Sequence, residues 1–211
     1  FDWYGSGDSG GRGADLAFDG MLEDLDAATG QCEAPPRLLA LRTASLPVLA
    51  HATARGRPVR LVLWDPLLSG ADVVATWRRQ HAQQLHAVGR YHGVPPAPGP
   101  QELLGFEVAP SLLQALSLLD FADAALPTGS TLMLAVWGVS ASLERFAARQ
   151  QSAGVAVEWL RLEAGDYIVS VAFGRAHLTR KVTVSSERPA QERFVLNAGG
   201  LRLASALANG E

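Results

Sequence analysis

The sequence predicts an α/β protein, in which a parallel sheet with crossover helices is followed by a small antiparallel β segment. Short apolar strands alternate with helical patterns over the first three quarters of the chain, which is the order that builds a parallel sheet. From Asp166 onward the pattern changes to short β-branched or alternating runs separated by turn residues. A hydrophobic content of 48% is enough for a real core. We therefore expect two domains, at residues 1–163 and 164–211.

Each element is predicted from a local pattern. Apolar residues recur at helical spacing, with glycine, proline or serine at the ends, in four segments: 15–29, 72–88, 110–122 and 140–152. Continuous apolar runs predict buried strands at 37–41, 59–64, 131–137 and 155–162, and the alternating runs predict strands at 166–173, 178–184, 193–196 and 201–207. Four prolines and two glycines predict a loop at 91–101. The helices between the second and third strands would form a lid at about residues 70–125.

Composition excludes several classes of protein. A net charge of −3 and a pI of about 6.0 give no electrostatic reason to expect nucleic acid. No apolar run approaches the roughly 20 residues that a transmembrane helix needs. Cys32 is the only cysteine, so no intrachain disulfide can form, and a reducing, cytoplasmic location is the simpler expectation. A periplasmic location stays open because the chain opens at Phe1 rather than at methionine.

No metal site or cofactor is expected. The acidic residues between Asp19 and Asp26 belong to a helical pattern and are interpreted as a solvated face. His81 and His86 are five residues apart, off the four-residue spacing that lets two imidazoles share a metal on a helix. His51 and His92 stand alone in the sequence.

The segment Arg37–His51 predicts a strand, a sharp turn and a helix, which is the context that carries the nucleophile of an α/β-hydrolase on a Gly-x-Ser-x-Gly elbow. The five elbow positions are occupied by Ala40-Leu41-Arg42-Thr43-Ala44. Arg42 stands at the position of the serine, and a guanidinium that stays protonated cannot act as a nucleophile. Ser45 is the nearest hydroxyl that could serve as a displaced nucleophile, almost one helical turn beyond the elbow.

The other two members of a catalytic triad are also missing at the expected places. The strand 131–137 is followed by Gly138-Val139-Ser140, with no carboxylate before Glu144. The strand 155–162 is followed by Glu163-Ala164-Gly165-Asp166, with no histidine, and His177 lies in the β segment. A serine hydrolase needs nucleophile, base and acid within mutual reach. No catalytic residue is therefore assigned.

Arg42, Thr43 and Asp65 are the candidate ligand-binding residues. Asp65 follows a strand, and strand C-termini border the cleft in open α/β sheets; its alternative role is a helix or turn cap. Arg42 could bind a carboxylate or phosphate group bidentately, or could be a structural ion-pair partner. The sequence leaves both pairs of alternatives open.

Residues 1–160 resemble the exosortase A system-associated hydrolases, of the second type found beside the export machinery for PEP-CTERM surface proteins. The likeness is carried by stretches at 2–9, 22–25, 41–44 and 63–70, and the arginine at the elbow is part of it. The chain departs from the pattern at Ala40, Ala44 and Pro47. The resemblance implies that strands one to three of the hydrolase fold would lie before Phe1, so we expect a truncated domain with an open sheet edge.

The segment from Glu163 to Glu211 resembles small carbohydrate- or surface-associated β-sandwich repeats such as PEGA-like domains, and we expect that it could contact a protein partner. The leading hypothesis is a catalytically degenerate hydrolase-fold protein that binds a small anionic ligand. The alternatives are an active acyl (ester) hydrolase with residues not assigned, and a β-sandwich interaction module fused to a hydrolase remnant.

Overall fold

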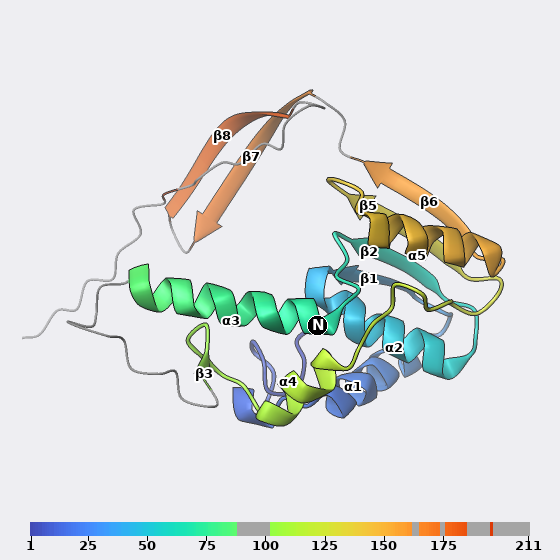
Figure 1. Cartoon of the computed structure of the whole chain (residues 1–211), viewed down its shortest axis with the longest axis horizontal. Helices are drawn as coiled ribbons and strands as arrows, with labels where there is room; N and C mark the ends of the chain where they lie inside the picture. Colours follow the sequence, from blue (N-terminus) through green and yellow to red (C-terminus); the bar gives the residue numbers. More distant parts are fainter. Residues whose placement is uncertain (88–101, 162–164, 174–175, 185–194, 196–211) are drawn as a thin grey trace, which may run out of the picture. The chain divides into compact units, whose positions relative to one another are not determined.

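The computed structural model describes residues 1–87, 102–161, 165–173, 176–184 and 195 (Figure 1). It divides into two compact units, residues 1–161 and 162–211. The predicted loop at 91–101 and the predicted strands at 193–196 and 201–207 lie outside the described residues, apart from Val195.

The first unit is built on a four-stranded parallel sheet, which confirms the predicted fold class. Its strands are β1 (Arg37–Leu41), β2 (Arg60–Trp64), β5 (Thr131–Val136) and β6 (Ala156–Arg161), in the spatial order β1-β2-β5-β6. Each strand lies beside its predecessor in the same direction across the sheet, and crossovers between parallel strands are right-handed. Such an order brings all crossover helices to one face, and Figure 1 shows α1, α2 and α5 on the same side of the sheet.

Within the described residues, five α-helices accompany the sheet: α1 (Phe18–Gly30), α2 (Ser45–Arg55), α3 (Gly70–Ala87), α4 (Pro110–Ser117) and α5 (Ala141–Ser152). The prediction for α4 is wrong at its end, which lies five residues earlier than expected. The backbone N–H of Leu119 donates to the carbonyl of Leu116 at 3.0 Å, and that of Phe121 donates to Leu68 at 2.9 Å. The tight last turn and the bond to the segment after β2 therefore end the helix before Ala122.

The core lies between the sheet and the helices. One face of each central strand is fully buried, with relative exposures of 0–2% for Leu61, Leu63, Leu132 and Leu134. These leucines pack in one cluster with Leu46 and Leu49 of α2 and Phe146 of α5. Alternate residues of the same strands point to the other face. Several large apolar side chains on that face are exposed to solvent.

The sequence did not reveal a short hairpin between α3 and α4. Strands β3 (Glu102–Leu103) and β4 (Phe106–Glu107) pair antiparallel around Leu104 and Gly105, which have φ of 56° and 84°. Two positive φ values in succession are typical of a type I′ hairpin turn. The N–H of Leu104 donates to Nδ1 of the buried His81 at 3.0 Å, which fixes the hairpin to α3.

The second unit contains an antiparallel pair, β7 (Gly165–Phe173) and β8 (Ala176–Val184), which agrees with the predicted antiparallel segment. Tyr167 pairs with Val182 and Val171 with Leu178 on one face, which also holds the pair of Val169 and Arg180. The opposite face carries an ion pair of 2.7 Å between Asp166 and Lys181. Hydrogen bonds from Lys181 and then Thr183 lower the pKa of the Asp166 carboxyl.

Candidate functional site

The turn after β1 has the strained geometry that the sequence predicts for an elbow. β1 ends at Leu41, a single 3-10 turn covers Arg42–Ala44, and α2 follows. Arg42 has φ of 50°, and Asp65, directly after β2, has φ of 46°. Non-glycine residues in this region cost on the order of 1–3 kcal/mol and persist only where the surroundings hold them. Two such residues therefore stand at the ends of adjacent strands.

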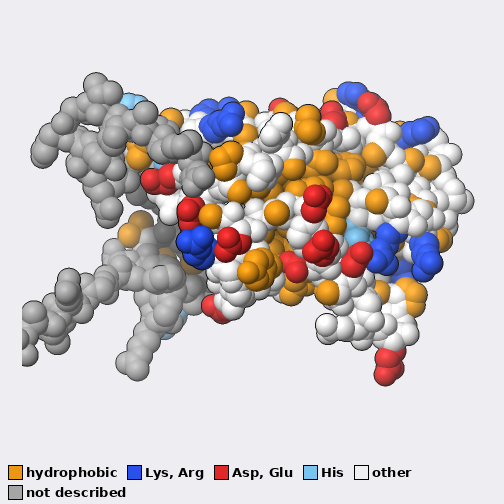
Figure 2. Space-filling model, turned by 90° about the horizontal axis from the view of Figure 1, so that it is seen from below, with side chains coloured by type: hydrophobic (Ala, Val, Ile, Leu, Met, Phe, Trp, Pro, Cys, Tyr) orange, Lys and Arg blue, Asp and Glu red, His pale blue; other side chains and the backbone are white. Residues whose placement is uncertain are grey.

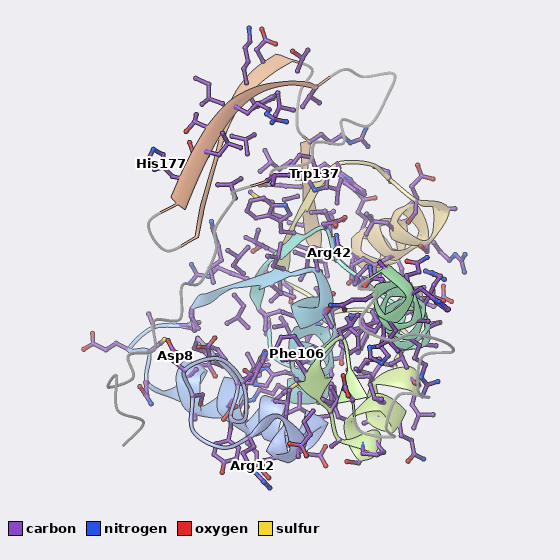
Figure 3. The ribbon with its side chains drawn as sticks, turned by 90° about the vertical axis from the view of Figure 1, so that its left-hand side faces the viewer. Asp8, Arg12, Arg42, Phe106, Trp137 and His177 are labelled. Atoms are coloured by element: carbon purple, nitrogen blue, oxygen red, sulfur yellow. The ribbon has the colours of Figure 1, made fainter. Side chains whose placement is uncertain are left out.

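The structure brings Arg42 and Asp65 together. Leu41 and Trp64 are partners in the parallel register, so the residues that follow them are neighbours. Nη1 of Arg42 contacts Oδ2 of Asp65 in an ion pair, with side chains 59% and 33% exposed. Figure 3 labels Arg42 at this end of the sheet. The structural role of Arg42 that the sequence left open is thus present, and it occupies one nitrogen of a guanidinium that has five N–H donors.

The backbone beside this ion pair is joined to the neighbouring strand by a hydrogen bond. The N–H of Asp65 donates to the carbonyl of Ala135 on β5 at 2.8 Å. Thr43, the third predicted ligand-binding residue, lies half-buried in the 3-10 turn. The site therefore consists of an exposed cation and a carboxylate, held by a rigid backbone at the carboxyl end of a parallel sheet, where ligands of open α/β folds bind.

Ser45 is fully buried, and its hydroxyl is engaged in the fold. Its Oγ lies 2.6 Å from the carbonyl oxygen of Arg42 and 2.7 Å from that of Leu67, and it accepts the N–H of Leu67 at 3.1 Å. The single hydroxyl proton is shared between the two carbonyl oxygens, and Oγ accepts the hydrogen bond of the amide N–H. This serine joins the elbow to the segment after β2. An attacking nucleophile would instead need an exposed hydroxyl with a base beside it.

The places where the acid and histidine were expected hold no such groups among the described residues. After β5, Trp137 is 64% exposed, and Ser140 caps α5 by accepting the N–H of Leu143 at 3.2 Å. Residues 162–164, which follow β6, lie outside the described residues. His177 belongs to β8 in the second unit.

Sequence reasoning missed one charged cluster, which joins α1 to α2. The buried His51 places Nε2 at 2.5 Å from Oδ1 of Asp26, and Arg55 pairs with the same oxygen. The hydrogen bond from His51 lowers the pKa of Asp26, and Arg55 contributes to the same direction. A signal was available, because His51 and Arg55 are four residues apart and so lie on one face of α2. The cluster is a contact between helices.

The acidic residues of α1 are mostly exposed. Figure 2 shows acidic side chains on the face of the molecule seen from below, and Asp19, Glu23 and Asp26 are exposed residues of α1. Within the part of the chain that the structure describes, no group of three or more His, Cys, Asp or Glu residues could hold a metal ion. No helix among the same residues is long and apolar enough to cross a bilayer.

Comparison with known proteins adds a likeness of fold. The chain matches no protein-family model and no curated protein. Among solved structures it is similar to alpha/beta hydrolase domain-containing protein 10 from mouse, with 16% sequence identity and a TM-score of 0.48. The match covers 75% of this chain and 66% of that chain, just under two thirds of its length.

Proposed function

We propose that this chain is a catalytically inactive α/β-hydrolase-like protein that binds a small anionic ligand through Arg42. The observation that carries the proposal is the identity and setting of the residue at the sharp turn. A guanidinium stands where a hydrolase would place its nucleophile, and its side chain is 59% exposed on a backbone with φ of 50°. The strained turn is kept, but a group that recognises anions replaces the group that attacks.

The ion pair with Asp65 is part of the proposed site. Asp65 engages one nitrogen and orients the planar guanidinium, which leaves N–H donors for a bidentate contact to a carboxylate or phosphate. The same carboxylate also competes with the ligand, because it neutralises the cation. Removing the negative charge at Asp65 should therefore strengthen anion binding, whereas removing the positive charge at Arg42 should abolish it.

The setting of this function is also a proposal. The resemblance of residues 1–160 to the exosortase-associated hydrolases suggests a role beside the export of PEP-CTERM surface proteins. The β7–β8 unit would then offer a surface for a protein partner. Both statements rest on the resemblance.

The test is a titration of the full chain with inorganic phosphate and with acetate, in which amide chemical shifts in NMR spectra report binding. Arg42→Gln should lose the saturable shifts of residues near the turn, and Asp65→Asn should bind more tightly than the natural chain. Arg145→Gln is the matched control, because Arg145 is 60% exposed and pairs with Asp123 at 3.9 Å in a different part of the unit. Equal binding by the Arg42 variant would refute the proposal.

The absence of catalysis needs a separate measurement. Incubation of the folded chain with a fluorophosphonate probe should give no heat-sensitive labelling. Specific labelling of any serine would favour the alternative of an active acyl hydrolase, whatever the phosphate titration shows.

A further inference from the structure

The face of the parallel sheet opposite the helices is apolar and exposed. Residues that are paired across the four strands form three rows on this face. The first row is Arg37, Arg60, Thr131 and Ala156, the second is Leu39, Val62, Met133 and Glu158, and the third is Leu41, Trp64, Ala135 and Leu160. Leu39 is 64% exposed, Leu41 54%, Trp64 44% and Leu160 56%. The third row is apolar across all four strands, with Ala135 within it buried, and the second row is apolar on β1, β2 and β5 and ends at Glu158. Together these apolar residues form a band across the sheet.

Such a face is unusual for a parallel sheet. Parallel sheets occur almost only where both faces are covered, because their strands carry apolar residues on both sides. Contiguous apolar patches of several strands' width mark interaction sites on folded proteins. Within the first unit, the helices α1, α2 and α5 lie on the other side of the sheet (Figure 1) and do not cover this band.

The charges on this face identify a partner. Arg37 begins the edge strand β1 and Arg60 begins its neighbour β2, whereas Glu158 lies on β6, at the opposite edge of the sheet. All three are exposed. The face is therefore cationic on one side and anionic on the other. A twofold axis parallel to the strands would lay β1 of one copy over β6 of another and would bring opposite charges together.

We infer that this face docks a second copy of the chain, in a twofold dimer with the two sheets stacked. Packed sheets lie roughly 10 Å apart with interdigitating side chains, which the leucine and tryptophan side chains can fill. Arg37 would lie over the start of the partner's β6. Glu158 of the partner subunit is two residues further along that strand, about 7 Å away and within reach of an arginine side chain. The interface is isologous, so each contact occurs twice.

The experiment is sedimentation equilibrium of the full chain and of point variants. The natural chain should be a dimer at about 10 µM, and Leu39→Glu should weaken association at least about 100-fold by placing a charge in the band. Leu118→Glu is the matched control, since Leu118 is 80% exposed at the end of α4, outside this face. It should leave the dimer unchanged.

Charge reversals test the proposed orientation. Arg37→Glu and Glu158→Arg should each weaken the dimer about tenfold, and the double variant should restore it, because the pair is then reversed rather than removed. A natural chain that stays monomeric at about 100 µM would overturn the inference. So would a dimer that Leu39→Glu leaves intact, or a double variant weaker than both single ones. None of these outcomes bears on anion binding at Arg42.

Discussion

The buried hydroxyl of Ser45 gives the sharpest test of whether this elbow is a structural turn or a catalytic one. Replacing Ser45 by alanine removes the acceptor of the Leu67 N–H and the donor to the carbonyls of Arg42 and Leu67. A buried donor left without its partner costs about 1–3 kcal/mol. The Leu67 N–H keeps a longer contact of 3.4 Å to the Arg42 carbonyl, which places the cost in the lower half of that range.

Alanine also favours the helix over serine by up to about 0.5 kcal/mol, so the net loss should be about 0.5–2 kcal/mol. For a unit of this size, 1 kcal/mol corresponds to roughly 2–4 °C in Tm, which predicts a decrease of about 1–8 °C. Thermal unfolding followed by circular dichroism measures it. Ser152→Ala is the control, because Ser152 also bonds a helical carbonyl, Ala148, at 2.9 Å but is exposed.

The reasoning would be refuted by one combination of results. If Ser45→Ala had the same Tm as the control variant, the hydroxyl of Ser45 would contribute nothing to the stability of the fold. If it also removed a fluorophosphonate label that the natural chain carries, Ser45 would be a nucleophile after all. A lowered Tm without any label in either protein is the expected result.

Three further predictions concern the packing of the first unit. Gly70→Ala should strongly lower the Tm, because a Cβ there would lie 1.8 Å from the carbonyl oxygen of Leu116, where α3 meets α4. Gln150→Leu should cost about 2–4 kcal/mol in urea unfolding, since its buried amide accepts the N–H of Leu126 at 2.8 Å and also donates to a carbonyl at 2.7 Å. The lowered folded pKa of Asp26 means that its contribution is present above its unfolded pKa of about 3.8 and is lost as the pH falls through the folded value. Asp26→Asn should therefore lower the Tm at pH 7 but lose less stability than the natural chain on acidification below about pH 4.

The sheet, its helices and the turn were predictable from the sequence because each follows from a local pattern. The apolar runs of β1, β2, β5 and β6 and the helical spacing between them need only neighbouring residues to be recognised. The end of α4 and the β3–β4 hairpin were not predictable in the same way. The first depends on a bond from Phe121 to Leu68, and the second is held by His81, 23 residues before Leu104. Both are decided by tertiary contacts.

The candidate site was predictable residue by residue but not as an arrangement. Arg42 and Asp65 were each recognised from their positions at strand ends, 23 residues apart in the chain. Their contact follows from the register of Leu41 with Trp64, and adjacency of two strands is a property of the fold. The bond between His51 and Asp26 was missed for the same reason. A histidine that stands alone in the sequence can have its partner on another helix.

The energetics of the elbow show that the ion pair of Arg42 and Asp65 is not what holds the strained turn. An exposed ion pair contributes about 0–1 kcal/mol, which is too little to hold two non-glycine residues at positive φ at a cost of about 1–3 kcal/mol each. The turn is held instead by the buried hydroxyl of Ser45 and by the N–H of Asp65 bonded to Ala135. Hydrogen bonds within the fold therefore hold the strained backbone, and the guanidinium of Arg42 is exposed. If Arg42 binds an anion as proposed, a backbone that is already fixed would lose less conformational entropy on binding.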